Sequence, residues 1–401
     1  MLFSVISIQG TALISQFILA GILPIDEFAI VRTVEATLQM LATVAPWGMS
    51  LLVVRLVSQD HKLIELKSLF TTHVLLAGLS ALVLVIVGMA IIEFYSSQTG
   101  EYLKLLLWVL VLTSLSRTSL NYFYGKEQYG LISTFTFVIS VASLVLLVVF
   151  TNYWQLNGWV LSRYVAETMV LVVALFFVRT KLTWKLNSRV ESKKMLSEGA
   201  AVSLSLVFRS AIDNLPLLIF AYLSISQEET ALYGLCTLLI TGAMIMPSSL
   251  ISVLLPRYGK LQKQAPDELA VYHAKHERYV IVAGIGIGLV ITALGPAISA
   301  VYDQKYSGLL PYLALTSSIL PIRAYTALNA NLLFVHHQTA TGTKINAVCA
   351  ALCMILCFAI YPASGLWGVI VSSIITEAVA AALFKYHSSK LAFVPIEGRN
   401  I

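Results

Sequence analysis

The sequence predicts an all-α integral membrane protein with about 12 transmembrane helices in two pseudo-symmetric six-helix bundles. Of 401 residues, 58% are hydrophobic and 11% are charged, and the mean hydropathy is +0.85. A soluble domain carries roughly 25% charged residues, so a soluble fold is excluded. The apolar residues fall into blocks of roughly 17 to 25, which is the length needed to cross about 30 Å of hydrocarbon.

Apolar windows bounded by charged or turn residues predict six spans in each half of the chain. In the first half they cover residues 3–22, 29–53, 69–92, 105–124, 131–151 and 158–178. In the second half they cover residues 199–222, 231–255, 279–301, 309–333, 345–361 and 366–385. These spans predict a first bundle at 1–178, a cytoplasmic linker at 179–198, and a second bundle at 199–401 that ends in a short cytoplasmic tail.

Lys and Arg gather in alternate loops, which orients the chain. If both termini are cytoplasmic, the loops on the other side hold only Lys104 and Lys305. An odd number of spans would break this alternation, so the positive-inside bias favours an even number. The same distribution argues against nucleic acid as the partner of a chain with net charge +6, because the basic residues do not form one patch. The first span has no basic segment before it, and we expect a retained helix rather than a signal peptide.

The two halves contain a weak internal repeat. One set of matched residues is spaced by 202, namely Asp26, Glu27, Ala29, Ser50 and Arg55 with Glu228, Glu229, Ala231, Ser252 and Arg257. A second set is spaced by 210, namely Asn121, Gly158, Ser162 and Glu167 with Asn331, Gly368, Ser372 and Glu377. Six spans per half imply equal orientation and a pseudo-twofold axis along the membrane normal. The alternative is chance identity between leucine-rich helices.

Charged residues inside the spans are candidates for function, because each costs roughly 2.5 to 3.5 kcal/mol at the bilayer centre. The basic ones are Arg32, Arg117, Arg163, Arg209 and Arg323, and the acidic ones are Glu35, Glu167, Asp213 and Glu377. Helical spacing pairs Arg32 with Glu35, Arg163 with Glu167, and Arg209 with Asp213. Such pairs are explained equally well by mutual neutralisation.

Arg117, Arg323 and Glu377 have no opposite charge within one turn of their own spans. A guanidinium group binds phosphate in a bidentate manner. We therefore predict that Arg117, Arg209 and Arg323 form a cationic cavity for an anionic, phosphate-bearing substrate. The alternative is that Glu377 or backbone carbonyls satisfy the two unpaired arginines.

Ion coupling and bending have their own candidates. Glu377, Asp213, Glu167 and Glu35 could couple H⁺ or Na⁺ or balance charge. Because a carboxylate beside an arginine titrates poorly near neutral pH, Glu377 is the favoured coupling residue. Pro46, Pro247 and Pro216 interrupt spans and are candidate hinges, although ordinary membrane helices also tolerate proline.

No pattern in the chain indicates catalysis, a metal site or a cofactor beyond a coupling ion. Walker A, G-x-S-x-G and H-E-x-x-H patterns are absent from the sequence, and every loop is too short for a domain, so we expect no enzyme. Cys349, Cys353 and Cys357 lie at helical spacing, which indicates packing. His273, His276, His336 and His337 fall in predicted loops without the ligands that would complete a metal site.

Several local motifs resemble one transporter family. LPIDEFAIVRTVEATLQML is similar to its signature between the first and second helices, although Ile25 and Ala29 replace residues that are often Pro and Gly. Further similar segments are Gly125-Lys126-Glu127 after Tyr122, Phe123 and Tyr124, LLPRYGKL at 254–261, and Thr376-Glu377. Together they resemble the polysaccharide-exporter branch of the MATE-like superfamily, the Wzx-type flippases of O-antigen and related units. The basic segment that commonly precedes the first helix is absent here.

The resemblance implies two six-helix bundles around a central cavity that opens alternately to each side. It implies a polyprenyl-pyrophosphate-linked oligosaccharide as cargo in lipopolysaccharide or similar biosynthesis, at the cell inner membrane. Cationic residues in such cavities are thought to engage the pyrophosphate. Implied partners are membrane lipids and the polymerase and chain-length proteins of the same pathway.

Two other functions stay open. A MATE-type multidrug antiporter shares this fold but exchanges cations and needs an unpaired acid in its cavity. A membrane scaffold of a glycan-assembly complex would have no need of costly embedded charges.

Overall fold

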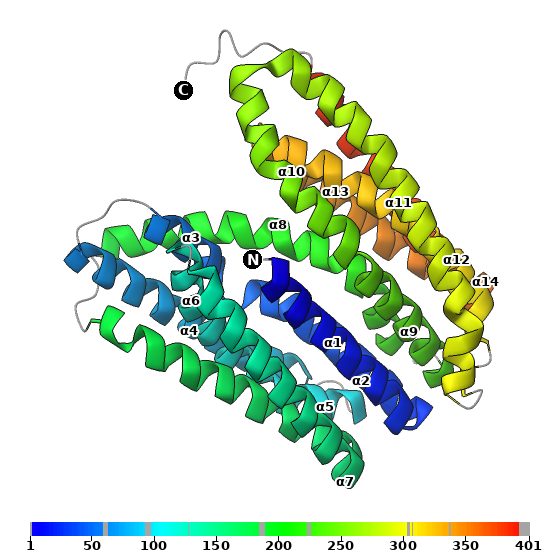
Figure 1. Cartoon of the computed structure of the whole chain (residues 1–401). Helices are drawn as coiled ribbons and strands as arrows, with labels where there is room; N and C mark the ends of the chain where they lie inside the picture. The colour runs from blue at the N-terminus through cyan, green and yellow to red at the C-terminus, as the bar shows by residue number, and fades with distance from the viewer. Residues whose placement is uncertain are drawn as a thin grey trace. The chain divides into compact units, whose positions relative to one another are not determined.

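The residues that the computed structural model of the chain describes are almost entirely helical, and they contain no strand (Figure 1). They are residues 2–58, 63–92, 98–126, 128–183, 189–222, 226–302, 305–306, 308–336 and 338–392. The chain divides into two compact units, unit 1 at Met1–Asn214 and unit 2 at Leu215–Ile401. This division falls inside helix α8 (Arg189–Tyr222), next to Pro216.

If the two parts of each broken helix are taken together and each folded helix is counted as two, the described residues contain six helical crossings before α8 and six from α8 onward. Before α8 the order is α1 (Leu2–Ile22), α2 (Ile25–Val44), α3 (Met49–Ser58), α4 (Leu63–Ile92), α5 (Gln98–Leu107), α6 (Val109–Gly125), α7 (Tyr129–Val178) and the short 3₁₀ turn η1 (Arg179–Lys181). After α8 it is α9 (Gln227–Ala243), α10 (Ile245–Gln264), α11 (Pro266–Val301), α12 (Leu309–Ser317), α13 (Ile319–Val335) and α14 (Thr339–Ala392). The predicted all-α membrane fold with about 12 spans is confirmed.

Four of the predicted spans are broken into two helices, as α2 and α3, α5 and α6, α9 and α10, and α12 and α13. At the first break Pro46 cannot donate a backbone hydrogen bond, and Trp47 and Gly48 take φ angles of 48° and 72°. Trp47 Nε1 donates to the Leu196 carbonyl of α8 at 3.1 Å, which holds the break against that helix. Broken helices are tolerated at membrane depth only where protein covers the free backbone groups.

Four other predicted spans are joined in pairs, because α7 and α14 each fold back on themselves without a loop. The reversal lies at Gln155 in α7, with φ 49°, and at Gly365 in α14, with φ 56°. Figure 1 shows the two arms of α7 meeting at this tip. Close approach of the arms requires a glycine, because a Cβ on Gly158 would lie 1.9 Å from the Phe150 carbonyl oxygen.

The internal repeat is confirmed by the backbone. Gln155 and Gly365 are 210 residues apart, and so are Trp108 and Ser318, which separate α5 from α6 and α12 from α13. The turns after α6 and α13 also match, since Gln128 N donates to Phe123 O at 3.0 Å and Gln338 N donates to Leu333 O at 2.9 Å. Both units therefore use the same order of helices, breaks and hairpins.

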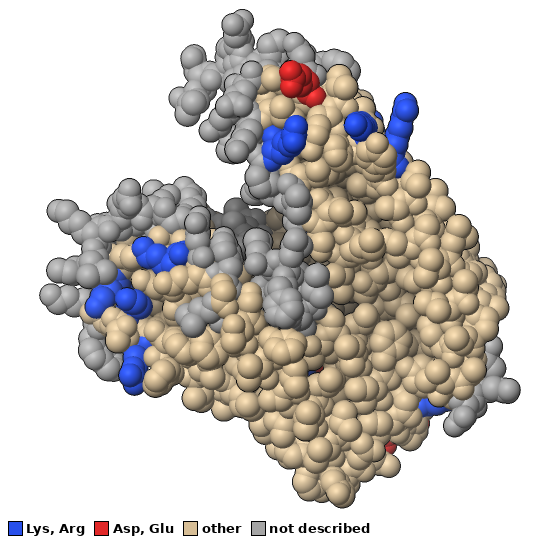
Figure 2. Space-filling view, in the orientation of Figure 1, with Lys and Arg blue, Asp and Glu red and all other residues tan. Residues whose placement is uncertain are grey.

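The outward surface of the helices is apolar, as lipid requires. Leu79 and Val83 of α4 are 58% and 60% exposed, and Val282 and Leu289 of α11 are each 67% exposed. On the face drawn in Figure 2, Lys and Arg lie mainly near helix ends and the surface between them is almost uncharged. Exposed apolar area of this extent indicates a lipid environment, so the chain is a multi-pass membrane protein.

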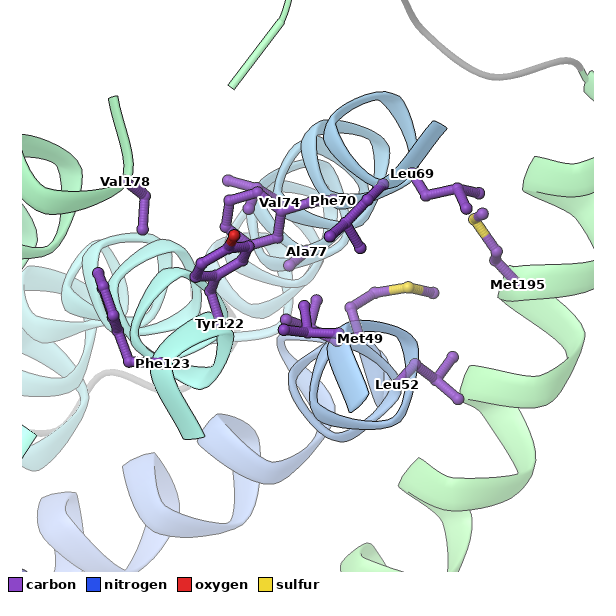
Figure 3. Close-up of a cluster of buried hydrophobic side chains, with 13 residues drawn as sticks. Met49, Leu52, Leu69, Phe70, Val74, Ala77, Tyr122, Phe123, Val178 and Met195 are labelled. Carbon is purple, nitrogen blue, oxygen red and sulfur yellow. The ribbon is translucent and has the colours of Figure 1, made fainter. Parts of the chain in front are cut away.

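The core of unit 1 is apolar at the end where α3 and α6 finish. Met49, Phe70 and Tyr122 point toward one another from α3, α4 and α6 (Figure 3). The rings of Phe70 and Tyr122 lie 5.0 Å apart in a tilted arrangement. Leu, Val and Met side chains complete this cluster, which we call the apolar end cluster of unit 1.

Candidate functional site

A cavity of about 260 Å³ lies inside unit 1 between α1, α2, α6 and both arms of α7. Its charged lining residues are Glu35, Arg117, Arg163 and Glu167. Hydroxyl and amide groups from α1, α6 and α7 add neutral hydrogen-bonding groups. The cavity therefore combines four ionisable side chains with many neutral polar ones inside an otherwise apolar bundle.

The periodicity of α7 explains why one helix supplies so much of this lining. Thr136, Ser140 and Ser143 of its first arm are spaced by four and three residues, so they share one helix face. On the second arm Trp159, Arg163 and Glu167 follow at intervals of four. The fold of α7 at Gln155 turns both faces toward the same cavity.

Arg163 makes its ion pair with Glu35 of α2. The Arg163 Nε to Glu35 Oε1 distance is 3.3 Å, and Arg163 Nη2 donates to Glu35 Oε2 at 3.3 Å. Helical spacing predicted Glu167 as the partner of Arg163 and Glu35 as the partner of Arg32. Arg32 instead donates from Nη1 to Gln16 Oε1 of α1 at 3.2 Å. Tertiary contacts between helices thus replace two of the three predicted local pairs.

Arg117 and Glu167 have no ion pair within 4.0 Å among the described residues, although both line the cavity. Glu167 still acts on Arg163 electrostatically. Trp159 is fully buried, and its Nε1–H has no hydrogen-bond partner in the described part of the chain. The cavity therefore offers a guanidinium and a carboxylate without an ion pair to whatever enters it. Sequence reasoning missed Trp159, because a single tryptophan in an apolar span carries no signal.

The third predicted local pair is present on α8. Arg209 Nη2 lies 3.2 Å from Asp213 Oδ1, one turn further along the helix. Both side chains are partly exposed, and the pair lies at the end of unit 1.

Arg323 and Glu377 form an ion pair inside unit 2. Arg323 Nε on α13 lies 3.0 Å from Glu377 Oε1 on α14, and the Glu377 side chain is 1% exposed. This is the alternative that the sequence left open for both residues. Glu377 is the counterpart of Glu167 in the repeat, so one unit pairs this acid with arginine and the other presents it to a cavity. A single cationic cavity formed by Arg117, Arg209 and Arg323 stays a prediction.

The three candidate hinge prolines lie near discontinuities of the helices. Pro46 is at the break between α2 and α3, and Pro247 is in the first turn of α10, just after the break at Met244. Pro216 lies inside α8 beside the boundary between the units.

Two of the histidines differ from their sequence interpretation, because His273 and His276 lie in a helix and not in a loop. His273 is 4% exposed and lies inside α11, because that helix begins at Pro266, well before the span predicted from 279. Hydropathy detects only the apolar part of a helix, so the polar start of α11 was taken for a loop. The cysteines of α14 are buried, and the described residues contain no group of three or more metal ligands. His337 lies outside the described residues.

Comparison with known proteins places the chain in a family. Residues 1–262 match the model of the polysaccharide biosynthesis protein family. No curated protein matches the chain in sequence.

Solved transporter structures share its fold. An inward-facing multidrug resistance MATE family transporter of the MOP superfamily has a TM-score of 0.72 at 13% identity, covering 95% of this chain and 94% of its own. A Vibrio cholerae MATE transporter, VcmN, has a TM-score of 0.68 at 15% identity over 97% and 94%. A MOP superfamily transporter from Pyrococcus furiosus, described as having a binding pocket of reverse polarity, has a TM-score of 0.62 at 12% identity over 98% and 94%. The chain therefore belongs to the polysaccharide biosynthesis protein family and has the fold of the MATE and MOP superfamily transporters, which confirms the resemblance seen in its motifs.

Proposed function

We propose that this transporter moves a polyprenyl-pyrophosphate-linked oligosaccharide, an O-antigen or similar surface polysaccharide unit, across the cytoplasmic membrane by alternating access. The observation that carries the proposal is the unpaired Arg117 in the cavity of unit 1, in a chain of the polysaccharide biosynthesis family. A pyrophosphate is doubly charged and rich in acceptors, so it matches the guanidinium of Arg117. With both termini cytoplasmic, the cargo would move outward toward the polymerase and chain-length proteins of its pathway.

The charged residues of the cavity favour one position for the pyrophosphate of the cargo. Glu35 already pairs with Arg163 at Nε and Nη2. Arg163 is therefore the weaker candidate for substrate binding. Arg117 keeps its whole fork available. The hydroxyl groups of Ser116 and Ser162 line the same space and add neutral donors. Binding of the anion therefore centres on Arg117.

Glu167 replaces Glu377 as the favoured coupling residue. Glu35, Asp213 and Glu377 each lie within 3.3 Å of an arginine, so their negative charges are already balanced inside the protein. Glu167 has no direct arginine partner in the described residues and shares the cavity with Arg117. A proton on Glu167 would remove the negative charge that opposes an anionic substrate, which links proton binding to substrate binding.

The first test is genetic complementation. In cells that lack the gene, lipid-linked oligosaccharide should accumulate in the cytoplasmic leaflet, and the wild-type chain should clear it. Arg117→Ala should fail to clear it while expression and melting temperature stay near wild type, because no described partner of Arg117 is left unpaired. Arg117→Lys should retain partial function, since an ammonium keeps the charge but loses the bidentate geometry. Arg179→Ala, an exposed arginine beyond the end of α7, is the control.

Two outcomes of this experiment contradict the proposal. Wild-type clearance by Arg117→Ala would show that Arg117 does not bind the cargo. Loss of drug resistance without accumulation of lipid-linked oligosaccharide would favour a multidrug antiporter, for which Glu35 and Glu167 in the cavity would serve a cationic substrate.

A second prediction concerns coupling. In vesicles that hold an imposed pH difference, Glu167→Gln should abolish the dependence of transport on that difference while leaving the folded protein intact. Glu377→Gln should lower stability instead, because it weakens the pair with Arg323. If Glu377→Gln folds normally and removes the pH dependence while Glu167→Gln keeps it, the coupling residue is Glu377. The same assay with Na⁺ in place of the pH difference identifies the coupling ion.

A further inference from the structure

A buried polar network lies at the end of unit 2 where α10 finishes and α11 begins. It joins four helices through Tyr258 of α10, His273 and Glu277 of α11, Asn329 of α13, and Lys385 and Ser388 of α14. Tyr258 and Asn329 are 0% exposed, and Ser388 is 1% exposed. None of these residues belongs to the cavity of unit 1 or to the pair of Arg323 with Glu377.

His273 is the centre of the network, and both of its ring nitrogens have partners. Nδ1 lies 3.0 Å from the Tyr258 hydroxyl. Nε2 lies 3.3 Å from Asn329 Oδ1 and 3.2 Å from Glu277 Oε1. Glu277 in turn accepts from Lys385 Nζ at 2.7 and 2.8 Å.

The neighbours of the ring assign its protons. Asn329 Nδ2 donates to the Tyr325 carbonyl at 3.1 Å, and Ser388 Oγ donates to Asn329 Oδ1 at 2.6 Å, so the oxygen of the amide faces His273. Nε2 therefore faces two acceptors and carries the hydrogen. In a neutral ring Nδ1 is then an acceptor, and the Tyr258 hydroxyl donates its hydrogen to it.

The corresponding place in unit 1 also contains buried polar groups, since His73 of α4 is 4% exposed and Asn121 Nδ2 of α6 donates to the Ser50 carbonyl of α3 at 2.6 Å. There α3, α4 and α6, the counterparts of α10, α11 and α13, meet in the apolar end cluster.

The helix that Tyr258 holds is a separate segment. α9 ends at Ala243 and α10 begins at Ile245, with Met244 between them and Pro247 in the first turn of α10. A break followed by proline allows a helix to change direction at that point. At Met244 the helical hydrogen bonds continue, since its N–H donates to the Ile240 carbonyl and its carbonyl accepts from Ser248, both at 3.0 Å. Pro247 is the residue that cannot donate, so this is the weak point of the helix, and the hydrogen bond from Tyr258 to His273 lies toward the far end of α10.

A second proton on His273 reverses this hydrogen bond, because Nδ1–H then donates to the Tyr258 hydroxyl oxygen. The groups that face the ring are Tyr258 from α10, Glu277 from α11, Tyr325 from α13 by way of Glu277, and Lys385 from α14 by way of Glu277. With Nδ1 protonated, the hydroxyl hydrogen of Tyr258 loses the one acceptor that the described residues give it. Glu277 then faces two cations, so the network changes from balanced to net positive.

We propose that uptake of a proton from water at Nδ1 of His273 leaves the buried hydroxyl hydrogen of Tyr258 without an acceptor, and that this loosens the contact of α10 with α11 and lets α10 move away from it. Imidazole is the side chain that titrates between about pH 5 and 8, which suits it to this role. The distribution of Lys and Arg predicts that this end of unit 2 faces the cytoplasm. If the protein works as the proposed transporter, this movement would make the opening of its cytoplasmic side depend on the cytoplasmic pH.

Spin labels on Arg257→Cys in α10 and Lys390→Cys in α14 test this movement directly. Both side chains are exposed, and the four native cysteines are buried. In lipid nanodiscs, the distance between the labels should lengthen and its distribution should broaden as the pH is lowered from about 8 to about 5. An unchanged distribution over this range overturns the proposal, whatever the variants show.

Variants identify the residue responsible. His273→Gln keeps a donor and an acceptor but cannot gain charge, so its label distance should not depend on pH. His276→Gln, one turn away with Nδ1 on the Tyr272 carbonyl, is the matched control and should keep the full pH response. Tyr258→Phe should hold the low-pH distance at every pH. A full response in His273→Gln, or its loss in His276→Gln, would contradict the assignment.

This measurement needs no substrate, which separates it from the proposed function. If deletion of the gene leaves lipid-linked oligosaccharide unchanged while the label distance still responds to pH through His273, the movement of α10 stands and the flippase proposal fails. If complementation succeeds and the label distance is constant, the reverse holds.

Discussion

Gly158→Ala is expected to leave little folded protein, with a loss of at least about 3 kcal/mol. An added Cβ would lie 1.9 Å from the Phe150 carbonyl oxygen and 2.3 Å from its carbonyl carbon. Both atoms are backbone, so no side-chain rotation relieves the overlap, and the arms of α7 must separate. The arms of α7 line the cavity of unit 1, so separation also disrupts the candidate site.

The repeat supplies a graded comparison for this prediction. At Gly368, the counterpart in α14, a Cβ would meet Ile360 Cγ2 at 2.8 Å and the Ile360 carbonyl oxygen at 3.0 Å. A side chain can move there, so Gly368→Ala should cost about 1 kcal/mol. Gly286→Ala has nothing within 4 Å and should be neutral or slightly stabilising, because alanine favours helix. Yield and melting temperature in detergent measure the relative stability of the three variants. Equal stability of Gly158→Ala and Gly286→Ala would contradict the close approach of the two arms of α7.

Arg323→Ala is the second substitution with a large expected effect, a loss of about 3 to 5 kcal/mol. It leaves the Glu377 carboxylate, whose side chain is 1% exposed, without the guanidinium that lies 3.0 Å away. The double variant Arg323→Met with Glu377→Leu should recover most of this loss, because apolar side chains of similar size can replace a buried ion pair. Thermal melting of the two single variants and the double variant measures the effect.

The double variant also separates structure from transport. Clearance of lipid-linked oligosaccharide by a stable double variant would mean that Arg323 serves only to pair with Glu377. A stable double variant that fails to clear it would support the predicted role of Arg323 in substrate binding. Wild-type stability in Arg323→Ala would contradict the pairing itself.

The course of the chain through the membrane could be predicted because hydropathy reports it directly. The breaks could be predicted only where proline marks them, as at Pro46. The breaks at Trp108 and Ser318 contain no proline at the break itself and were missed, as was the reversal at Gln155. Such features depend on which neighbouring helix covers the free backbone groups, and that information lies outside any local window.

The sequence predicted which residues form the candidate site, but not which of them contact one another. Counting embedded charges found Glu35, Arg117, Arg163 and Glu167, all of which line one cavity. Spacing along one helix could not find the pair of Arg163 with Glu35, because its partners are 128 residues apart. His273 was missed for a related reason, since its burial comes from four helices that meet only in the folded protein.

The hairpins of α7 and α14 bear on how the protein can be handled. Most helical hairpins end in a loop of several residues, which is where proteases cut and where inserted sequences are tolerated. At Gln155 and Gly365 the chain reverses at a single non-helical residue between two helical arms, with no loop of several residues at either tip. An epitope tag, a fluorescent protein or a protease site placed at either tip would have to unwind the hairpin to be accommodated, so reporters belong elsewhere on the chain.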